Sequence, residues 1–210
     1  MRGFRQLIAS PFALAATGLA LAAFMAFVLP LPDFSGAIVA GDGSAFDLDF
    51  AYTVAEAFER AAAFEGAEKA AFVRAHWTWD LAYPFVYGAF FLCAWAFALE
   101  RLAPGSKAAS AAPFLTLAAP LFDLAENAAA SVLVALAPAR EGPAAFAALA
   151  AVVATPAKWV AVAACFAGVA VLFAALGAKA LRTARRAGPG NDTPPRQGAE
   201  AGRPRSGRHS

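Results

Sequence analysis

The sequence predicts an all-α protein, a bundle of four helices that each cross a membrane. Of its 210 residues 60% are hydrophobic and only 15% are charged, whereas soluble domains are roughly half apolar and about a quarter charged. Four apolar stretches reach the ~20 residues that a spanning helix requires. We place the spans at about 8–31, 80–100, 110–137 and 156–180, with an outer loop over 32–79.

The first span, 8–31, contains no charged residue. A cleavable signal peptide is the alternative, but its apolar region is usually only ~7–15 residues long. This stretch is much longer, so we expect a retained helix. Pro11 falls in its first turn, where proline is tolerated.

The outer loop is expected to contain two helices. Thr53 and Glu56 have the spacing of a capping box before a run with helical periodicity. Gly66 interrupts that run, and a second helix is predicted from about residue 67 towards Trp77. We expect both helices to be amphipathic and to rest on the outer membrane face, with Trp77 at the level of the lipid headgroups.

The start of the fourth span depends on Thr155 and Pro156. The apolar stretch from residue 144 to 180 is too long for one span. Because threonine can cap a helix and proline prefers its first position, we start the span at about 156. Residues 144–154 then form a short separate helix at the outer surface. One long helix kinked at Pro156 is the alternative.

The distribution of basic residues predicts the orientation, because cytoplasmic flanks are enriched in Lys and Arg. We therefore expect residues 1–186 to form a domain in the inner cell membrane. Both termini are expected on the cytoplasmic side. The tail, 187–210, is rich in Pro, Gly and Arg, so we expect it to be disordered. It lacks aromatic interleaving, and we expect no nucleic-acid binding. The basic residues on the cytoplasmic side are Arg2, Arg5, Arg101, Lys107, Lys179, Arg182, Arg185 and Arg186, and those on the outer side are Arg60, Lys69, Arg74, Arg140 and Lys158.

The second span carries polar residues on one face, at Asp80, Tyr83 and Tyr87. The ordinary interpretation is that Asp80 caps the helix and Tyr83 belongs to an interfacial aromatic belt. Tyr87 lies about 10 Å deeper than Asp80 at ~1.5 Å per residue. A phenol at that depth needs a hydrogen-bond partner, so we expect Tyr87 to face the bundle.

The third span carries the stronger signal. Asp123, Glu126 and Asn127 lie at i, i+3 and i+4 and share a face. Each ionised side chain costs about 2.5–3.5 kcal/mol near the bilayer centre. The helix must therefore bury this face against protein or keep a carboxyl protonated. Ionisable residues inside a membrane indicate a functional site, and hydrogen-bonded contact between helices is the alternative.

Lys158 is the obvious cation for these acids, but the predicted boundaries argue against the pairing. Lys158 would lie in the first turn of the fourth span and lean outward. Glu126 would lie ~15 Å below the outer end of its own helix and lean inward. Tyr87 is the more suitable neighbour by depth.

No motif indicates a metal or a cofactor. His76 and Asp80 share a face, but no dense metal-ligand motif, phosphate-binding loop or catalytic Ser/His/Asp set is present. Cys93 and Cys165 lie in apolar runs and are expected to pack as small hydrophobic residues. We therefore expect neither a metal site nor a cofactor.

The order Asp-x-x-Tyr-Pro-x-x-Tyr over 80–87, followed by Asp-x-x-Glu-Asn over 123–127, resembles a group of uncharacterised bacterial four-span integral membrane proteins. The resemblance covers roughly residues 10–180. It implies a shared fold and no known activity.

The sequence favours a binding or accessory membrane protein whose partners are membrane lipids or a small amphiphile. Tyr83, Tyr87, Glu126 and Asn127 would line the binding cavity. The alternative is an intramembrane enzyme acting on a lipid, with Asp123 or Glu126 as general acid/base. Proton-coupled transport needs a polar path across the membrane, which the apolar inner halves of the second and third spans do not provide.

Overall fold

The computed structural model describes residues 2–31, 37–39, 46 and 49–186. The predicted tail, 187–210, and parts of the outer loop lie outside the described residues. The chain divides into two compact units, Met1–Leu176 and Gly177–Ser210. The site described below and the helices up to Leu176 of the last helix belong to the first unit.

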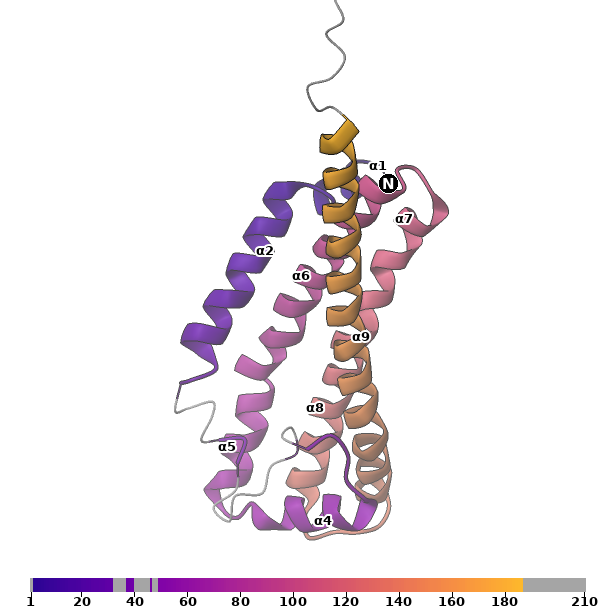
Figure 1. The fold of residues 1–210 in the computed structure, drawn as a ribbon. Helices are drawn as coiled ribbons and strands as arrows, with labels where there is room; N and C mark the ends of the chain where they lie inside the picture. Colours follow the sequence, from indigo (N-terminus) through magenta and orange to yellow (C-terminus); the bar gives the residue numbers. More distant parts are fainter. Residues whose placement is uncertain (1, 32–36, 40–45, 47–48, 187–210) are drawn as a thin grey trace, which may run out of the picture. The chain divides into compact units, whose positions relative to one another are not determined.

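The protein is all-α, as predicted. Within the described residues, four helical stretches are long and apolar enough to cross a membrane: Pro11–Val28, Ala67–Leu102, Lys107–Leu136 and Pro143–Arg186. The successive helices are α1 (Arg2–Ile8), α2 (Pro11–Ala23), the π-helical turn η1 (Phe24–Val28), α4 (Val54–Ala63), α5 (Ala67–His76), α6 (Trp79–Leu102), α7 (Lys107–Ala111), the 3₁₀ helix η2 (Ala112–Leu117), α8 (Ala118–Leu136) and α9 (Pro143–Arg186) (Figure 1).

Helix α2 has a capped N-terminus and an apolar exposed surface. The Ser10 side chain accepts a hydrogen bond of 3.0 Å from the amide of Ala13, and Pro11 occupies the first turn. The helix packs beside α6 (Figure 1). Phe12 and Leu19 are 79% and 72% exposed. Such an uncharged apolar surface is what a lipid-facing helix requires.

The outer-loop segment forms the two predicted helices, α4 and α5. The capping box at the start of α4 is confirmed, because Thr53 and Glu56 each bind the other's backbone amide. Gly66 has a φ of +48° and separates α4 from α5. The Lys69 ammonium donates to the carbonyl of Ala137, just after the end of α8, at 2.6 Å. This bond ties α5 to the end of the bundle.

Helix α4 lies across the ends of α8 and α9 (Figure 1), over a core of aromatic and aliphatic side chains. Phe46, Phe64, Phe72 and Leu133 are fully buried there. Helices α4 and α5 therefore cover the end of the bundle with a hydrophobic cluster of their own.

Helix α9 is one continuous helix from Pro143, where a separate surface helix over 144–154 was expected. Residues of its first turns are buried in the core beneath α4, including Ala144, Ala147, Ala148 and Ala151. Thr155 lies inside this helix, with its hydroxyl oxygen 3.0 Å from the carbonyl oxygen of Ala151 one turn earlier, so Thr155 does not start a helix. Tertiary burial of this alanine stripe outweighs the local helix-breaking tendency of Pro156.

The side chain of Trp95 on α6 reaches α9 at Gly168. The Trp95 indole lies over this glycine and donates to the carbonyl of Cys165 at 3.3 Å. Cys93 and Cys165 are both free and buried, as expected for small core residues. The glycine leaves room for the indole between the two helices.

We expect Gly168→Ala to destabilise the protein, although Ala normally favours a helix over Gly. The added methyl group would overlap the Trp95 ring, and overpacking of this kind costs about 1–3 kcal/mol. Gly18→Ala in α2 is the matched control, since its methyl group would meet Phe90 at an ordinary 3.6 Å. Thermal unfolding in detergent should show a lower midpoint for Gly168→Ala alone. Equal midpoints for the two variants would contradict the packing described here.

Candidate functional site

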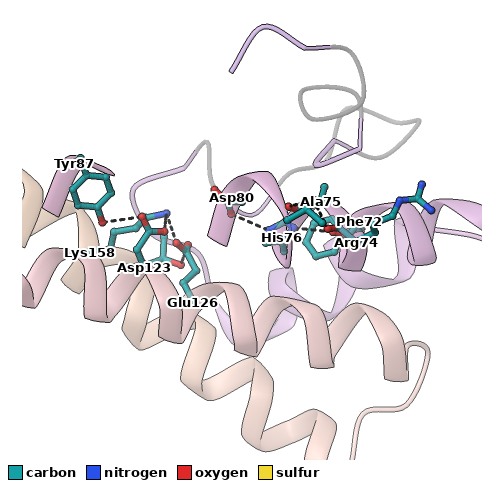
Figure 2. Close-up of polar contacts among 11 residues, drawn as sticks. Phe72, Arg74, Ala75, His76, Asp80, Tyr87, Asp123, Glu126 and Lys158 are labelled. Atoms are coloured by element: carbon teal, nitrogen blue, oxygen red, sulfur yellow. Dashed lines mark hydrogen bonds and ion pairs between the residues drawn. The ribbon is translucent and has the colours of Figure 1, made fainter. Parts of the chain in front are cut away.

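Four polar side chains from three helices meet in the bundle interior. The Tyr87 hydroxyl of α6 donates to Asp123 Oδ2 of α8 at 2.8 Å. Lys158 Nζ of α9 lies 3.6 Å from Asp123 Oδ1 and also pairs with Glu126 Oε2 (Figure 2). Each of these residues is at most 7% exposed. Tyr87 and Asp123 are therefore in direct contact, and Lys158 joins them.

The expectation that Lys158 could not reach these acids is wrong, because α9 begins 13 residues before residue 156. Lys158 thus lies 15 residues into α9, or about 22 Å at ~1.5 Å per residue. Glu126 lies ten residues before the end of α8, or about 15 Å from it. Lys158 leans back towards the start of α9 and Glu126 leans towards the start of α8, so their side chains converge.

The polar contacts continue from Glu126 through Thr155 to Tyr52, just before α4. The Thr155 hydroxyl donates to Glu126 Oε1 and lies 3.0 Å from the hydroxyl of Tyr52. Thr155 is fully buried and Tyr52 is 6% exposed. Neither residue was predicted as part of the site. The local sequence at Thr155 predicts a helix cap, and no spacing in the sequence connects Tyr52 to the third span.

His76 and Asp80 form a second polar pair, next to the start of α6 (Figure 2). His76 Nε2 lies 3.8 Å from Asp80 Oδ2, and His76 Nδ1 lies 3.0 Å from the carbonyl of Phe72. Helix α6 begins at Trp79, so Asp80 lies in its first turn rather than before it. Among the residues that the structure describes, no group of three or more His, Cys, Asp or Glu side chains is arranged to hold a metal ion.

A cavity of about 400 Å³ lies beside these residues, between α2 with η1, α6, α8 and α9. This volume is in the range of small-molecule sites, which are mostly apolar with a few polar groups. Its apolar lining residues are Leu21, Met25, Leu29, Ile38, Phe91, Trp159, Val162 and Phe166, and its polar lining residues are Asp80, Tyr83, Tyr87, Asp123 and Lys158.

Four of the six predicted site residues line this cavity: Asp80, Tyr83, Tyr87 and Asp123. Glu126 and Asn127, which were expected to line it too, are not among its lining residues. Glu126 instead points towards Thr155 on α9, behind Lys158. Asn127 is 2% exposed, and within the described part of the chain its side-chain amide has no hydrogen-bond partner.

The cluster of Asp123, Glu126 and Lys158 places one ammonium between two carboxylates in a buried position. Desolvation of such groups is costly, and the mutual attraction compensates only while all partners are present. The cluster therefore constrains how α8 and α9 pack, and it places charged atoms at the edge of a mostly apolar cavity.

We expect Lys158→Met to destabilise the fold strongly, because it leaves two buried carboxylates without their shared cation. Removing one partner of a buried ion pair typically costs about 3–5 kcal/mol. Lys107→Met, at an exposed position in α7, is the matched control and should change stability by less than about 0.5 kcal/mol. Chemical denaturation in mixed micelles would measure both. A Lys158→Met protein as stable as the control would refute a structural role for this pairing.

Comparison with models of known protein families, with curated proteins and with solved structures finds no match to this chain. The resemblance of its two short motifs to bacterial four-span membrane proteins stays a prediction. The function is therefore argued from the contacts and the cavity of the chain itself.

Proposed function

We propose that this chain is a multi-pass membrane protein that binds a small amphiphile, such as a lipid, in the cavity beside Tyr87 and Asp123. The observation that carries the proposal is the division of the cavity lining. Apolar side chains of α2, η1 and α9 form most of it, and Tyr87, Asp123 and Lys158, which contact one another, form a polar part of the lining. An amphiphile has the same division between an apolar chain and a polar head.

The cavity is accessible to such a molecule. Its lining residues Met25 and Trp159 are 51% and 38% exposed, so its walls reach the surface of the bundle. If the helices span a bilayer, a lipid-like ligand can enter there without crossing a polar barrier. The polar groups would then select its head, while the apolar walls would hold its chain.

The orientation is part of the proposal. Lys and Arg favour the cytoplasmic flanks, which places both termini inside the cell and the start of α6 at the outer surface of the inner membrane. Tyr87 lies eight residues into α6, or about 12 Å at ~1.5 Å per residue. The cavity would then occupy the outer half of the bilayer, within reach of lipids in the outer leaflet.

A second candidate function is an intramembrane enzyme acting on a lipid. Its support is the hydrogen bond of 2.8 Å between the Tyr87 hydroxyl and Asp123, both of which line the cavity. A buried carboxyl next to a phenol can serve as a general acid/base pair. Turnover of any member of a lipid panel, lost in Asp123→Asn, would favour this function over simple binding.

We expect Val162→Phe to abolish ligand binding by filling the cavity, which Val162 lines. Val171→Phe introduces the same ring on the same helix at a position that is 68% exposed, and it should leave binding unchanged. Native mass spectrometry of each protein, released from detergent, would report co-purifying lipid. The proposal predicts an adduct on the wild type and on Val171→Phe, and none on Val162→Phe. Equal adducts on all three proteins would place the bound lipid outside this cavity.

A further inference from the structure

We propose that the C-terminal end of α9 binds the head groups of anionic phospholipids at the membrane surface. The binding surface is the arginine face of this helix end, formed by Arg182, Arg185 and Arg186. These residues belong to the second compact unit, Gly177–Ser210. The arginine face is therefore a site separate from the cavity, and its ligand does not depend on what the cavity binds.

Helix α9 is longer than one membrane crossing requires. Its 44 residues correspond to about 66 Å at ~1.5 Å per residue, whereas the hydrocarbon core of a bilayer is about 30 Å thick. Residues 159–178 contain no charged side chain and are long enough to cross it. The helix then continues to Arg186. In a membrane that holds the uncharged stretch, these last turns lie at the level of the head groups.

The three arginines share one side of the helix. At 3.6 residues per turn, Arg182, Arg185 and Arg186 fall within an arc of about 100°. All ten residues from 177 to 186 are exposed. The three guanidinium groups can therefore meet a flat, charged surface together.

The positive charge of the arginine face is not neutralised by ion pairs. Within the described part of the chain, none of the three arginines forms an ion pair. Residues 177–186 include no Asp or Glu. The sequence that follows does not supply an excess of acid either, since 187–210 has four arginines against Asp192 and Glu200.

Guanidinium groups and a membrane surface suggest one class of ligand. Arginine binds phosphate through two parallel hydrogen bonds, which a lysine ammonium cannot form. Basic residues next to a spanning helix are attracted to anionic lipids, and the attraction falls off within a Debye length of about 8 Å. An exposed helix surface holds a single soluble phosphate weakly. A bilayer presents many phosphates at once and keeps them next to the three arginines, so we assign the arginine face to lipid head groups.

The test uses the full-length protein in micelles of an uncharged maltoside detergent. Its probes are phosphatidylglycerol, which is anionic, and phosphatidylcholine, which has no net charge, with identical acyl chains. Native mass spectrometry of a titration with each lipid gives the two dissociation constants. The wild type should bind phosphatidylglycerol at least about fivefold more tightly than phosphatidylcholine. Raising the ammonium acetate concentration should reduce this preference.

Three variants locate the preference. Arg182→Gln/Arg186→Gln removes two charges from the arginine face and should bring the two dissociation constants close to equality. Arg74→Gln/Arg140→Gln is the matched control, because it removes the same charge at exposed positions outside α9. This control should keep the wild-type preference. Val162→Phe alters the cavity and should also keep the preference, whatever its effect on the total amount of bound lipid.

The outcomes separate this site from the cavity. A preference that is lost only in Arg182→Gln/Arg186→Gln supports lipid binding by the arginine face. Equal affinity of the wild type for the two lipids overturns it, and so does an equal loss in the two double variants. A preference that is lost in Val162→Phe and kept in Arg182→Gln/Arg186→Gln would place the anionic lipid in the cavity, which overturns this site and leaves the proposed function standing. Equally tight binding of glycerophosphoglycerol, the same head without acyl chains, would overturn the assignment to lipid.

Discussion

The contact of Lys158 with Asp123 and Glu126 is the constraint on which the rest of the bundle depends. A charge that is excluded from water must be paired, so α8 and α9 cannot slide past one another without exposing an unpaired group to an apolar environment. Apolar alanine surfaces would tolerate such sliding. The charged cluster therefore fixes the register of the two helices, and the Thr155 hydroxyl on Glu126 reinforces it.

This pairing requires the unbroken course of α9. The helix begins at Pro143 beneath α4, where its small side chains pack in the cluster with Leu133 of α8. Only because of those additional turns does Lys158 lie deep enough for its side chain to meet Glu126. The segment before α4 also contributes to the site, since Tyr52 extends the polar contacts through Thr155.

Stability alone does not explain why charged residues occupy this position. Replacing a whole buried ionic cluster with well-packed apolar side chains is often neutral or stabilising. Here Asp123 and Lys158 also line a cavity of about 400 Å³ whose other walls are mostly apolar. Polar contacts with the head of a lipid-like ligand, as proposed above, are a physical reason to keep these charged residues.

The sequence by itself determined the features that depend on local chemistry: the apolar lengths of the helices, the Thr53–Glu56 cap, and the shared polar face of Asp123, Glu126 and Asn127. Tertiary structure decided the rest. The helical propensities near Thr155 and Pro156 indicate a boundary, yet burial of the preceding turns keeps α9 continuous. That displacement of the boundary moves Lys158 from the end of a helix into its middle, which reverses the argument about its pairing. The depth of a residue in the bundle depends on where its helix packs against neighbouring helices. The sequence of that helix alone does not determine this depth.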